Sequence, residues 1–194
     1  NKISICIAGK NQCAIDALKY LILNYKKNYN ILALPNKNDK GNDTWQKSFK
    51  KFAISKNIKI INLKKLYTIK NLYLFSIEYE NILKIENFNS SNLFNIHFSL
   101  LPKYKGCHTN FYQIYYGEKY SGVSLHKIDS GIDTGPLISQ ISFEVPLNST
   151  AYENYLKLMK YSVIIFKKNL KRILNNEYNL KKQNSKKGSY FNRE

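Results

Sequence analysis

The sequence has no hydrophobic run long enough to cross a membrane. Its longest apolar stretches, such as 93–98 and 162–166, are far shorter than the roughly 20 residues that a transmembrane helix needs. The first residues of the chain do not have the pattern of a secretory signal peptide. We therefore expect a cytoplasmic protein without a membrane partner.

Cysteine and clustered histidine are also scarce. The three cysteines are an odd number and form no Cys-x-x-Cys pair, which argues against a disulfide framework or a zinc module. The three histidines show neither the His-x-x-x-His nor the His-Glu-x-x-His spacing of metal sites. We expect no metal ion.

Arginine is nearly absent from a strongly basic chain. The formal net charge of +18 invites a nucleic-acid interpretation, because basic surfaces attract phosphates. However, only Arg172 and Arg193 are arginines, and the lysines are spread along the chain among many asparagines, isoleucines and tyrosines. No arginine stripe or aromatic and basic platform is present. The composition therefore indicates an AT-rich genome, and we expect no nucleic-acid partner.

Strand and helix patterns alternate through the first half of the chain. A β-rich run at 3–9 precedes a helical spacing at 11–25, and further strands are predicted at 29–34, 58–62, 72–77 and 93–98, with a helix at 48–56. This alternation predicts an α/β fold of Rossmann-like type with a mostly parallel central sheet.

The second half continues the pattern and ends in a long helix. We predict a helix at 107–116, strands at 122–128 and 137–145, of which the latter can run antiparallel, and an amphipathic helix at 149–174. Ser149 or Thr150 would cap that helix together with Glu153. The catalytic domain is expected to cover 1–175, with 176–194 as a C-terminal hairpin or tail.

Asn95 and His97 lie in the predicted strand 93–98. They are two residues apart, so both side chains project from one face of the strand. Pro102 and Gly106 follow closely and end the strand. The pair therefore lies at a carboxyl strand end, where open α/β sheets bind ligands. The next such junction is the tight loop 129–136, which contains Asp133 and two glycines.

These three residue types suit acyl transfer to an amine. His97 can accept the amine's proton near neutral pH. The Asn95 amide N–H can stabilise the oxyanion of a tetrahedral intermediate, a contribution of about 3 kcal/mol. Asp133 can orient the imidazole and favour its charged form, or it can help move the proton through water. His126 is expected to be structural within its strand, whereas His108 is equally compatible with a surface position and with the mouth of the site.

Other features can be read in two ways. The turn at Ala8–Asn11 can present Lys10 and main-chain N–H groups to a phosphate, or it can be an ordinary helix start. Trp45 can stack on a flat ligand, but we expect a core anchor. The carboxylates Glu78 and Glu80 can be solvated or can line a ligand loop.

The segment NIHFSLLPKYKG, followed by GVSLHKIDSGIDTGPLI, resembles the signature of the folate-dependent formyltransferases. The resemblance implies a Rossmann-like domain, 10-formyltetrahydrofolate as donor co-substrate, and Asn95, His97 and Asp133 as catalytic residues. It also implies that two segments hold the pterin. Their cofactor-binding residues would be Phe75, Ser76, Ile77, Glu78, Asp129, Gly131 and Ile132.

Within this family, three stretches (ICIAGKNQCAIDAL, NKNDKGNDTW and FSIEYE) resemble bacterial enzymes that formylate dTDP-linked amino-dideoxy sugars, such as dTDP-4-amino-4,6-dideoxyglucose. Such enzymes act in O-antigen, lipopolysaccharide and other surface-polysaccharide biosynthesis. Lys10 and Asn11 would then contact the pyrophosphate, and Trp45 or Tyr190 would stack on thymine. Tyr79 and Lys84 complete the predicted substrate-binding set.

Two alternatives stay open. The chain could act like a methionyl-tRNA formyltransferase, with its basic charge serving RNA, although little sequence follows Leu174 to form that enzyme's C-terminal domain. It could also be a non-catalytic folate-binding module. The long helix and the pair Tyr190–Phe191 suggest a homodimer.

Overall fold

The structure is a computed structural model that describes residues 2–192. The chain divides into two compact units between Phe94 and Asn95, inside strand β5 (Asn92–His97). Among residues 2–192, no helix has the length and apolarity needed to cross a membrane.

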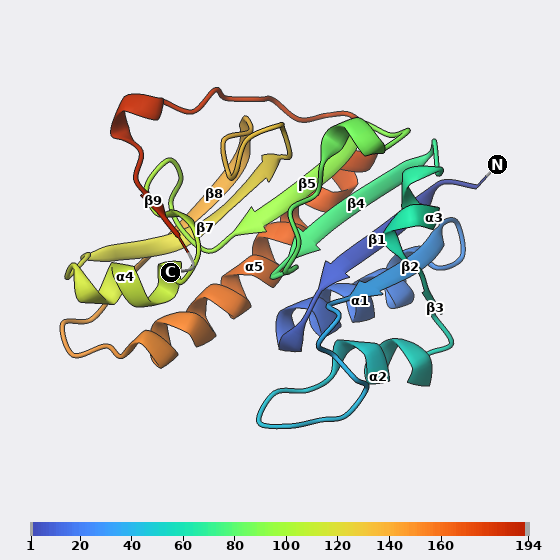
Figure 1. The fold of residues 1–194 in the computed structure, drawn as a ribbon, viewed down its shortest axis with the longest axis horizontal. Helices are drawn as coiled ribbons and strands as arrows, with labels where there is room; N and C mark the ends of the chain where they lie inside the picture. The colour runs from blue at the N-terminus through green and yellow to red at the C-terminus, as the bar shows by residue number, and fades with distance from the viewer. Residues whose placement is uncertain (1, 193–194) are drawn as a thin grey trace. The chain divides into compact units, whose positions relative to one another are not determined.

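The first unit is a parallel sheet with helices. Its elements are β1 (Ser4–Gly9), α1 (Asn11–Tyr25), β2 (Asn30–Pro35), α2 (Phe49–Ser55), β3 (Lys59–Ile60), α3 (Leu63–Tyr67), β4 (Leu72–Ile77) and the 3₁₀ turn η1 (Ile85–Asn87). The strand order is β3-β2-β1-β4, and the pairs are parallel (Figure 1). Every residue of β1 and β4 is buried, as expected for strands that are covered on both faces.

The register of the first unit aligns the ends of its strands. Gly9 pairs with Pro35 on one side and with Ile77 on the other. The carboxyl ends of β1, β2 and β4 therefore meet at one edge. A Cβ on Gly9 would overlap the carbonyl oxygen of Ile77, so this close approach requires glycine.

The second unit contains the end of β5 and the rest of the chain. Its elements are β6 (Lys105–Gly106), α4 (Thr109–Tyr115), β7 (Tyr120–Lys127), β8 (Leu137–Glu144), α5 (Ala151–Leu174), the 3₁₀ turn η2 (Ser185–Lys187) and β9 (Tyr190–Phe191). Strand β8 runs antiparallel to β7, and α5 packs on both strands and on α4 (Figure 1). Strands β6 and β9 form a separate parallel pair.

The predicted fold class is confirmed: the sheet is mostly parallel, and a long C-terminal helix follows it. Thr150, rather than Ser149, caps α5 and forms the capping box with Glu153. Helix α3 was not predicted, because five residues are too few for a helical period to emerge.

The chain after α5 runs along the second unit as an extended segment. Lys181 exchanges two main-chain hydrogen bonds of 2.8 Å with Leu137. Strand β9 then pairs with β6 in the loop that follows β5. We call residues 181–191 the C-terminal strap.

Candidate active site

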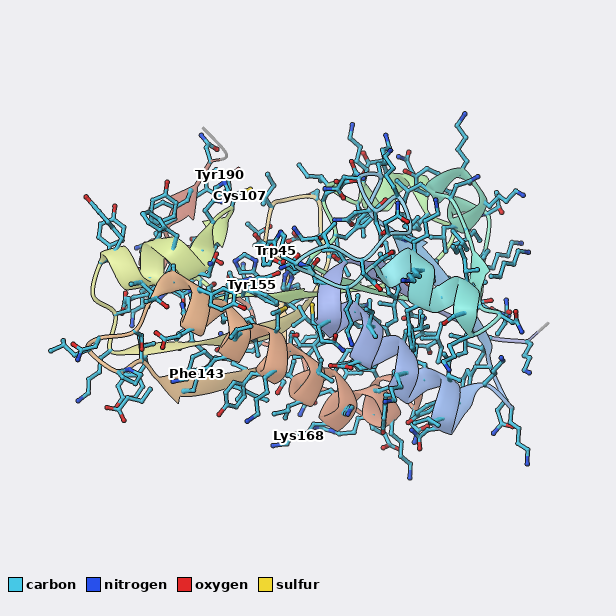
Figure 2. All side chains as sticks on the ribbon, turned by 90° about the horizontal axis from the view of Figure 1, so that it is seen from below. Trp45, Cys107, Phe143, Tyr155, Lys168 and Tyr190 are labelled. Carbon is cyan, nitrogen blue, oxygen red and sulfur yellow. The ribbon has the colours of Figure 1, made fainter. Side chains whose placement is uncertain are left out.

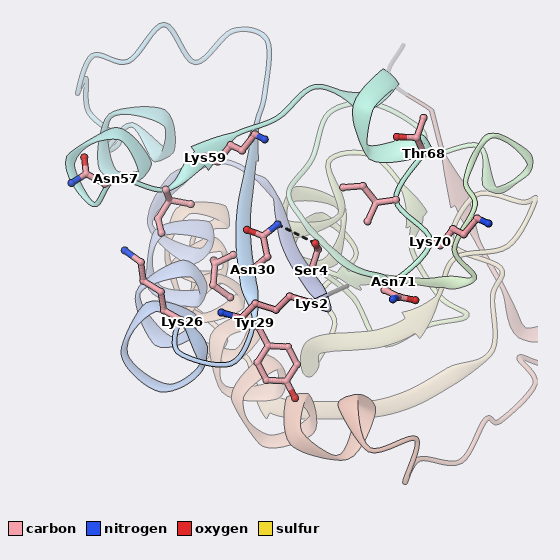
Figure 3. Close-up of a pocket in the computed structure, with 13 residues that line it drawn as sticks. Lys2, Ser4, Lys26, Tyr29, Asn30, Asn57, Lys59, Thr68, Lys70 and Asn71 are labelled. Atoms are coloured by element: carbon pink, nitrogen blue, oxygen red, sulfur yellow. Dashed lines mark hydrogen bonds between the residues drawn. The ribbon is translucent and has the colours of Figure 1, made fainter.

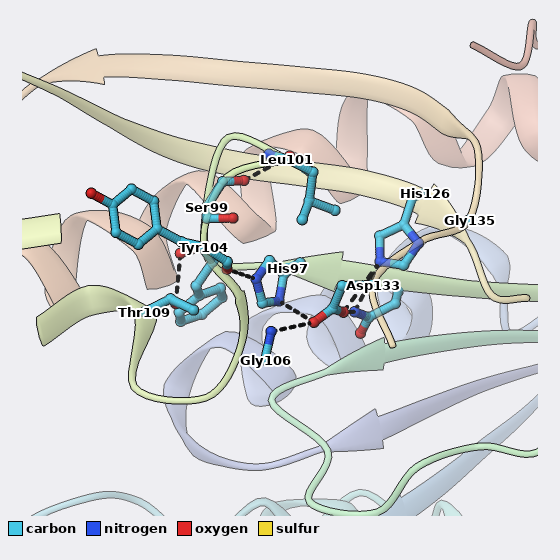
Figure 4. A network of polar contacts seen from close by, with 12 residues as sticks. His97, Ser99, Leu101, Tyr104, Gly106, Thr109, His126, Asp133 and Gly135 are labelled. Carbon is cyan, nitrogen blue, oxygen red and sulfur yellow. Dashed lines mark hydrogen bonds and ion pairs between the residues drawn. The ribbon is translucent and has the colours of Figure 1, made fainter. Parts of the chain in front are cut away.

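His97 ends β5 and is held through both ring nitrogens. Its Nε2–H donates to the carbonyl oxygen of Tyr104 over 2.6 Å. A carbonyl oxygen can only accept, so Nε2 carries a proton. The other nitrogen, Nδ1, faces the Oδ2 atom of Asp133 at 3.4 Å (Figure 4). The ring is 8% exposed, so water contributes little to its orientation.

Asp133 lies in the loop after β7 and has the left-handed φ of 54°. Its Oδ2 atom accepts the Gly106 N–H at 2.9 Å, and its Oδ1 atom accepts an N–H of Asn95 at 3.2 Å. The Nε2 atom of His126 lies 3.6 Å from the same Oδ1 atom. Figure 4 shows the carboxylate between the two imidazole rings.

The pKa of Asp133 reflects these neighbours. Burial alone would raise the pKa, but the positive charge of His97 in its protonated form, the nearby His126 ring and the Gly106 N–H outweigh burial and hold the pKa well below its usual range. The carboxylate therefore stays ionised at neutral pH and acts as a fixed negative charge.

Asn95 uses both N–H groups of its amide within the site. The Nδ2 atom lies 3.1 Å from His126 Nε2 and 3.2 Å from Asp133 Oδ1. His126 can accept there because its Nδ1–H donates to the carbonyl oxygen of Lys127 at 2.7 Å. His126 is thus a fourth member of the network. Sequence reasoning took it for a structural strand residue, although it lies in the same GVSLHKID segment that leads to Asp133.

Buried polar contacts fix the chain just after His97. The Ser124 hydroxyl on β7 donates to Ser99 O at 2.6 Å and accepts from Leu101 N at 3.0 Å. On α4, the Thr109 hydroxyl donates to Phe98 O at 2.8 Å. These bonds pair buried main-chain groups, and they hold the loop that brings Tyr104 to His97.

The predicted pterin loop has a shape that its own side chains maintain. Asp129 Oδ1 accepts the Gly131 N–H at 3.1 Å and the Thr134 hydroxyl at 2.6 Å. The carboxylate of Asp129 is therefore used within the loop. The side chain of Ile132 is 38% exposed and can contact a ligand.

The other predicted cofactor residues lie in the first unit. Three of them are buried in β4, so main-chain groups at the strand's end are what a ligand there would meet: Phe75, Ser76 and Ile77. Glu78 follows with a φ of 61°. The amide of Asn36 holds this turn, because Asn36 Nδ2 donates to Glu78 O at 3.2 Å and Glu80 N donates to Asn36 Oδ1 at 3.3 Å. Sequence reasoning missed Asn36, which is 2% exposed.

Lys10 and Asn11 start α1 at the same edge of the first unit. Lys10 Nζ lies 3.9 Å from Glu78 Oε2. Asn11 is 6% exposed and has the left-handed φ of 62°. The start of this 15-residue helix, beside a lysine, has the positive potential that a phosphate prefers.

Comparison with known proteins identifies the family. The model of the formyl transferase family matches residues 77–169. WlaRD, a sugar 3N-formyl transferase solved with dTDP and 5-N-formyl-THF, is 49% identical over 100% of this chain and 70% of its own, with a TM-score of 0.95. This chain belongs to the folate-dependent formyltransferases. The N-formyltransferase of Helicobacter canadensis, solved with folinic acid and dTDP-3-aminofucose, is 46% identical over 98% of this chain and 71% of its own, with a TM-score of 0.94.

Curated relatives of this formyltransferase are longer proteins. The methionyl-tRNA formyltransferase of Acetivibrio thermocellus is 30% identical over 87% of this chain and 58% of its own length. The bifunctional polymyxin resistance protein ArnA of Wigglesworthia glossinidia brevipalpis is 40% identical over 57% of this chain and 16% of its own length. The chain therefore spans less than two thirds of either protein.

Aromatic residues of the formyltransferase are available for stacking. The expectation that Trp45 is a core anchor is wrong: its side chain is 78% exposed, in the polar loop before α2 (Figure 2). Tyr190, in β9 of the second unit, is 50% exposed. Tyr79 is half-buried, and burial raises its pKa although Asn81 opposes the shift. Lys84 is exposed at the start of η1.

The thiols of the first unit are not suited to nucleophilic catalysis. Cys6 and Cys13 are buried, and burial raises the pKa of both thiols far above the ordinary value. Within residues 2–192, no cluster of three or more His, Cys, Asp or Glu side chains could hold a metal ion.

A lysine-lined hollow of about 910 Å³ lies in the first unit of the formyltransferase, at the amino ends of β1, β2 and β4 (Figure 3). Two of its ammonium groups already donate to the main chain: Lys2 to Lys27 O at 2.8 Å and Lys26 to Lys56 O at 3.4 Å. Open α/β sheets bind ligands at the opposite, carboxyl ends of their strands. The hollow is therefore not the candidate active site.

Stability should fall as the pH drops, because Asp133 has a lowered pKa. Its stabilising effect is complete above the unfolded carboxyl value of about 3.9 and is lost as the pH falls below that value toward the lower folded pKa. Urea unfolding of the wild type and of Asp133→Asn between pH 7 and pH 2.5 tests this. The stability difference between the two should shrink in the acid range, and a constant difference would contradict the assignment.

Proposed function

We propose that this formyltransferase moves the formyl group of 10-formyltetrahydrofolate to the amine of a dTDP-linked 3-amino-dideoxy sugar. The observation that carries the proposal is the similarity to WlaRD and to the Helicobacter canadensis enzyme along nearly all of this chain, together with the network around His97 and Asp133. The first of these proteins is a sugar 3N-formyl transferase, and the second was solved with dTDP-3-aminofucose. We therefore place the amine at C3, whereas the example predicted from sequence carried it at C4.

The setting of the proposal follows from this substrate. We propose that the enzyme acts in the cytoplasm, on a nucleotide-linked precursor of a surface polysaccharide such as O-antigen or lipopolysaccharide. We also propose that the enzyme is a homodimer and that it has no nucleic-acid partner.

In the proposed mechanism, Nδ1 of His97 receives the proton that the attacking amine loses. The mechanism requires that Nδ1, which faces the carboxylate of Asp133 at 3.4 Å, carry no proton before transfer. After transfer, the same pair is an imidazolium and a carboxylate joined by a charge-assisted hydrogen bond. The interaction is thus stronger along the reaction than before it, which is the condition for catalysis by differential binding.

Asn95 would stabilise the oxygen of the tetrahedral intermediate. In this structure both of its N–H groups are engaged, by His126 and by Asp133. The proposed role therefore requires that one of these bonds be exchanged for the developing oxyanion. Collapse of the intermediate would break the bond between the formyl carbon and N10 of the folate, and the proton on His97 would pass to that nitrogen, so that tetrahydrofolate leaves. Because the formyl donor is already activated, no covalent enzyme intermediate is needed, and positioning of donor and amine supplies much of the acceleration.

The donor and the acceptor would meet different features of the chain. Main-chain groups at 75–78 and in the loop 129–132 would hold the pterin of the donor. Lys10 and the start of α1 would bind the pyrophosphate, while an exposed ring such as Trp45 or Tyr190 would stack on thymine. Tyr79 and Lys84 complete the proposed acceptor contacts.

The test is a transfer assay with purified protein and 10-formyltetrahydrofolate. The acceptors are dTDP-linked 3-amino and 4-amino sugars, a UDP-linked amino sugar and methionyl-tRNA, and mass spectrometry measures the formylated product. We expect the dTDP-3-amino sugars to have the highest kcat/KM. Preference for methionyl-tRNA would select the RNA alternative, and folate binding without transfer to any amine would select the non-catalytic module.

Substituting Lys10→Met should weaken the binding of the nucleotide sugar. Loss of one ammonium contact to a pyrophosphate should raise KM for the dTDP-sugar about tenfold while kcat stays within about twofold, as expected for uniform binding. Lys26→Met is the matched control, because Lys26 Nζ donates to the carbonyl oxygen of Lys56 in the hollow at the amino strand ends. Equal KM values for the two variants would refute the pyrophosphate assignment.

A further inference from the structure

We propose that Gln183 and Ser189, both in the C-terminal strap, are positioning residues for formyl transfer. Neither needs to touch a substrate. Each holds the main chain of one of the two loops that set the geometry of His97 and Asp133. The inference rests on the proposed function of the site.

Gln183 holds the loop of Asp133. Its Nε2 atom donates to the carbonyl oxygen of Asp133 at 2.9 Å and to that of Gly135 at 2.7 Å. Asp133 has a left-handed φ, a conformation that costs a non-glycine residue on the order of 1–2 kcal/mol and persists only where the surroundings enforce it. The two hydrogen bonds from Gln183 supply that enforcement on both sides of Thr134.

The oxygen of the Gln183 amide makes no hydrogen bond to the described residues, so the two bonds from Nε2 fix the position of the side chain. Its Oε1 atom is buried, and no donor reaches it from the described residues. A buried acceptor without a partner costs roughly 1–3 kcal/mol. Glutamine at this position therefore carries a cost, because one of its polar atoms is buried without a partner. Its NH₂ group offsets that cost by donating to two carbonyl oxygens at once.

Ser189 holds the loop of His97. Its Oγ atom accepts the N–H of Tyr104 at 2.8 Å, and its carbonyl oxygen accepts the N–H of Lys105 at 2.9 Å. Tyr104 also has a left-handed φ, of 56°, and its own carbonyl oxygen accepts the His97 Nε2–H. The Ser189 hydroxyl thus acts on His97 through one residue, Tyr104, and the Ser189 carbonyl acts through the peptide group that joins Tyr104 to Lys105.

The strap is anchored at both ends, so it can hold both loops at once. The pairing of Lys181 with Leu137 fixes its beginning. At its end, the Cys107 N–H donates to Phe191 O at 3.0 Å, and the Phe191 ring stacks on Tyr112 with centroids 4.2 Å apart. The strap therefore ties together the two backbone segments whose separation determines the distance from Nδ1 to Oδ2.

A positioning role predicts a particular kinetic pattern. Misplacement of a catalytic pair lowers the rate of the chemical step and leaves substrate contacts intact. Loss of either strap contact should therefore lower kcat with little change in KM. It should also move the pH dependence of kcat, because the contact between His97 and Asp133 changes.

The experiment compares Gln183→Met, Ser189→Ala, Ser189→Thr and Lys182→Met with the wild type. Lys182 is exposed on the same strap and serves as the control. We measure kcat, both KM values and the pH profile of kcat with 10-formyltetrahydrofolate and the preferred dTDP-sugar. We expect kcat to fall about 10–100-fold in Gln183→Met and about 3–10-fold in Ser189→Ala, with KM within about threefold. Ser189→Thr, which keeps the hydroxyl, should restore kcat.

A second readout does not depend on turnover. The Nε2–H proton of His97 is detected by NMR in uniformly ¹⁵N-labelled protein, and it should shift and exchange faster in Ser189→Ala but not in Ser189→Thr or Lys182→Met. Unchanged kcat and an unchanged His97 signal in both Gln183→Met and Ser189→Ala would overturn the proposal, as would a loss confined to KM. If Gln183→Met does not fold, the Ser189 pair decides. If the wild type formylates no acceptor, the proposed function fails, and the His97 signal still tests the strap.

Discussion

Replacing Asp133 by asparagine should lower kcat for formyl transfer by about 10³–10⁴-fold without unfolding the protein at neutral pH. The carboxylate only accepts hydrogen bonds, and donors approach both of its oxygens: Gly106 N–H at Oδ2 and the Asn95 amide at Oδ1. The amide of asparagine would have to direct its NH₂ group at one of these donors, so that two donors face each other and a hydrogen bond is lost. It also removes the negative charge that would stabilise a proton on His97.

The measurement is single-turnover formyl transfer, with circular dichroism as the check on folding. Glu144→Gln is the control, because it makes the same change at an exposed position at the end of β8 in the same unit. His97→Ala should lose activity to a similar extent, and the double variant should lose little more, since the two side chains act as one unit. An Asp133→Asn variant within tenfold of wild-type kcat would refute the mechanism.

Replacing Gly106 by alanine should have the second-largest effect. Gly106 has a φ of +89°, which costs alanine on the order of 1–2 kcal/mol. An added Cβ would also overlap the carbonyl oxygen of Phe191 in β9, and such overpacking costs about 1–3 kcal/mol more. The strain falls on the residue whose N–H donates to Asp133, so we expect lower stability together with lower kcat.

Gly117→Ala provides the matched control for this prediction. Gly117 also has a positive φ, of +65°, but no atom lies within 4 Å of an added Cβ. Urea unfolding should therefore show only the conformational cost, on the order of 1–2 kcal/mol, and kcat should stay at the wild-type value. Equal losses in the two variants would mean that the approach of β9 to Gly106 does not matter.

Much of the fold was predictable because its signals are local. Parallel strands such as β1 are continuous apolar runs, and the capping box of α5 lies within four consecutive residues. Asn95 and His97 were found because spacing along a strand determines which side chains share a face. The loop of Asp133 was found because glycines and aspartates together mark a tight turn.

The rest of the site depends on contacts between distant residues, which leave no local pattern. The hydrogen bond from Gln183 to Asp133 spans 50 residues, and Asn36 reaches Glu78 across 42. His126 looks like any strand residue until its Nε2 atom is seen 3.1 Å from Asn95. Trp45 was misjudged because tryptophan is usually buried, whereas the loop that carries it leaves the ring exposed.

The hydrogen bond between Ser189 and Tyr104 joins residues that lie 85 positions apart in the chain. Contacts of this separation are slow to form, because the cost of closing a long loop comes before the gain from the contact. At a synthesis rate of about 5–20 residues per second, a ribosome would need roughly 4–17 s to add those 85 residues. During that time His97 and its acceptor Tyr104 already exist, but the residue that secures Tyr104 has not been made. The active site of the newly synthesised enzyme is therefore completed only after α5 and the strands before it have been made.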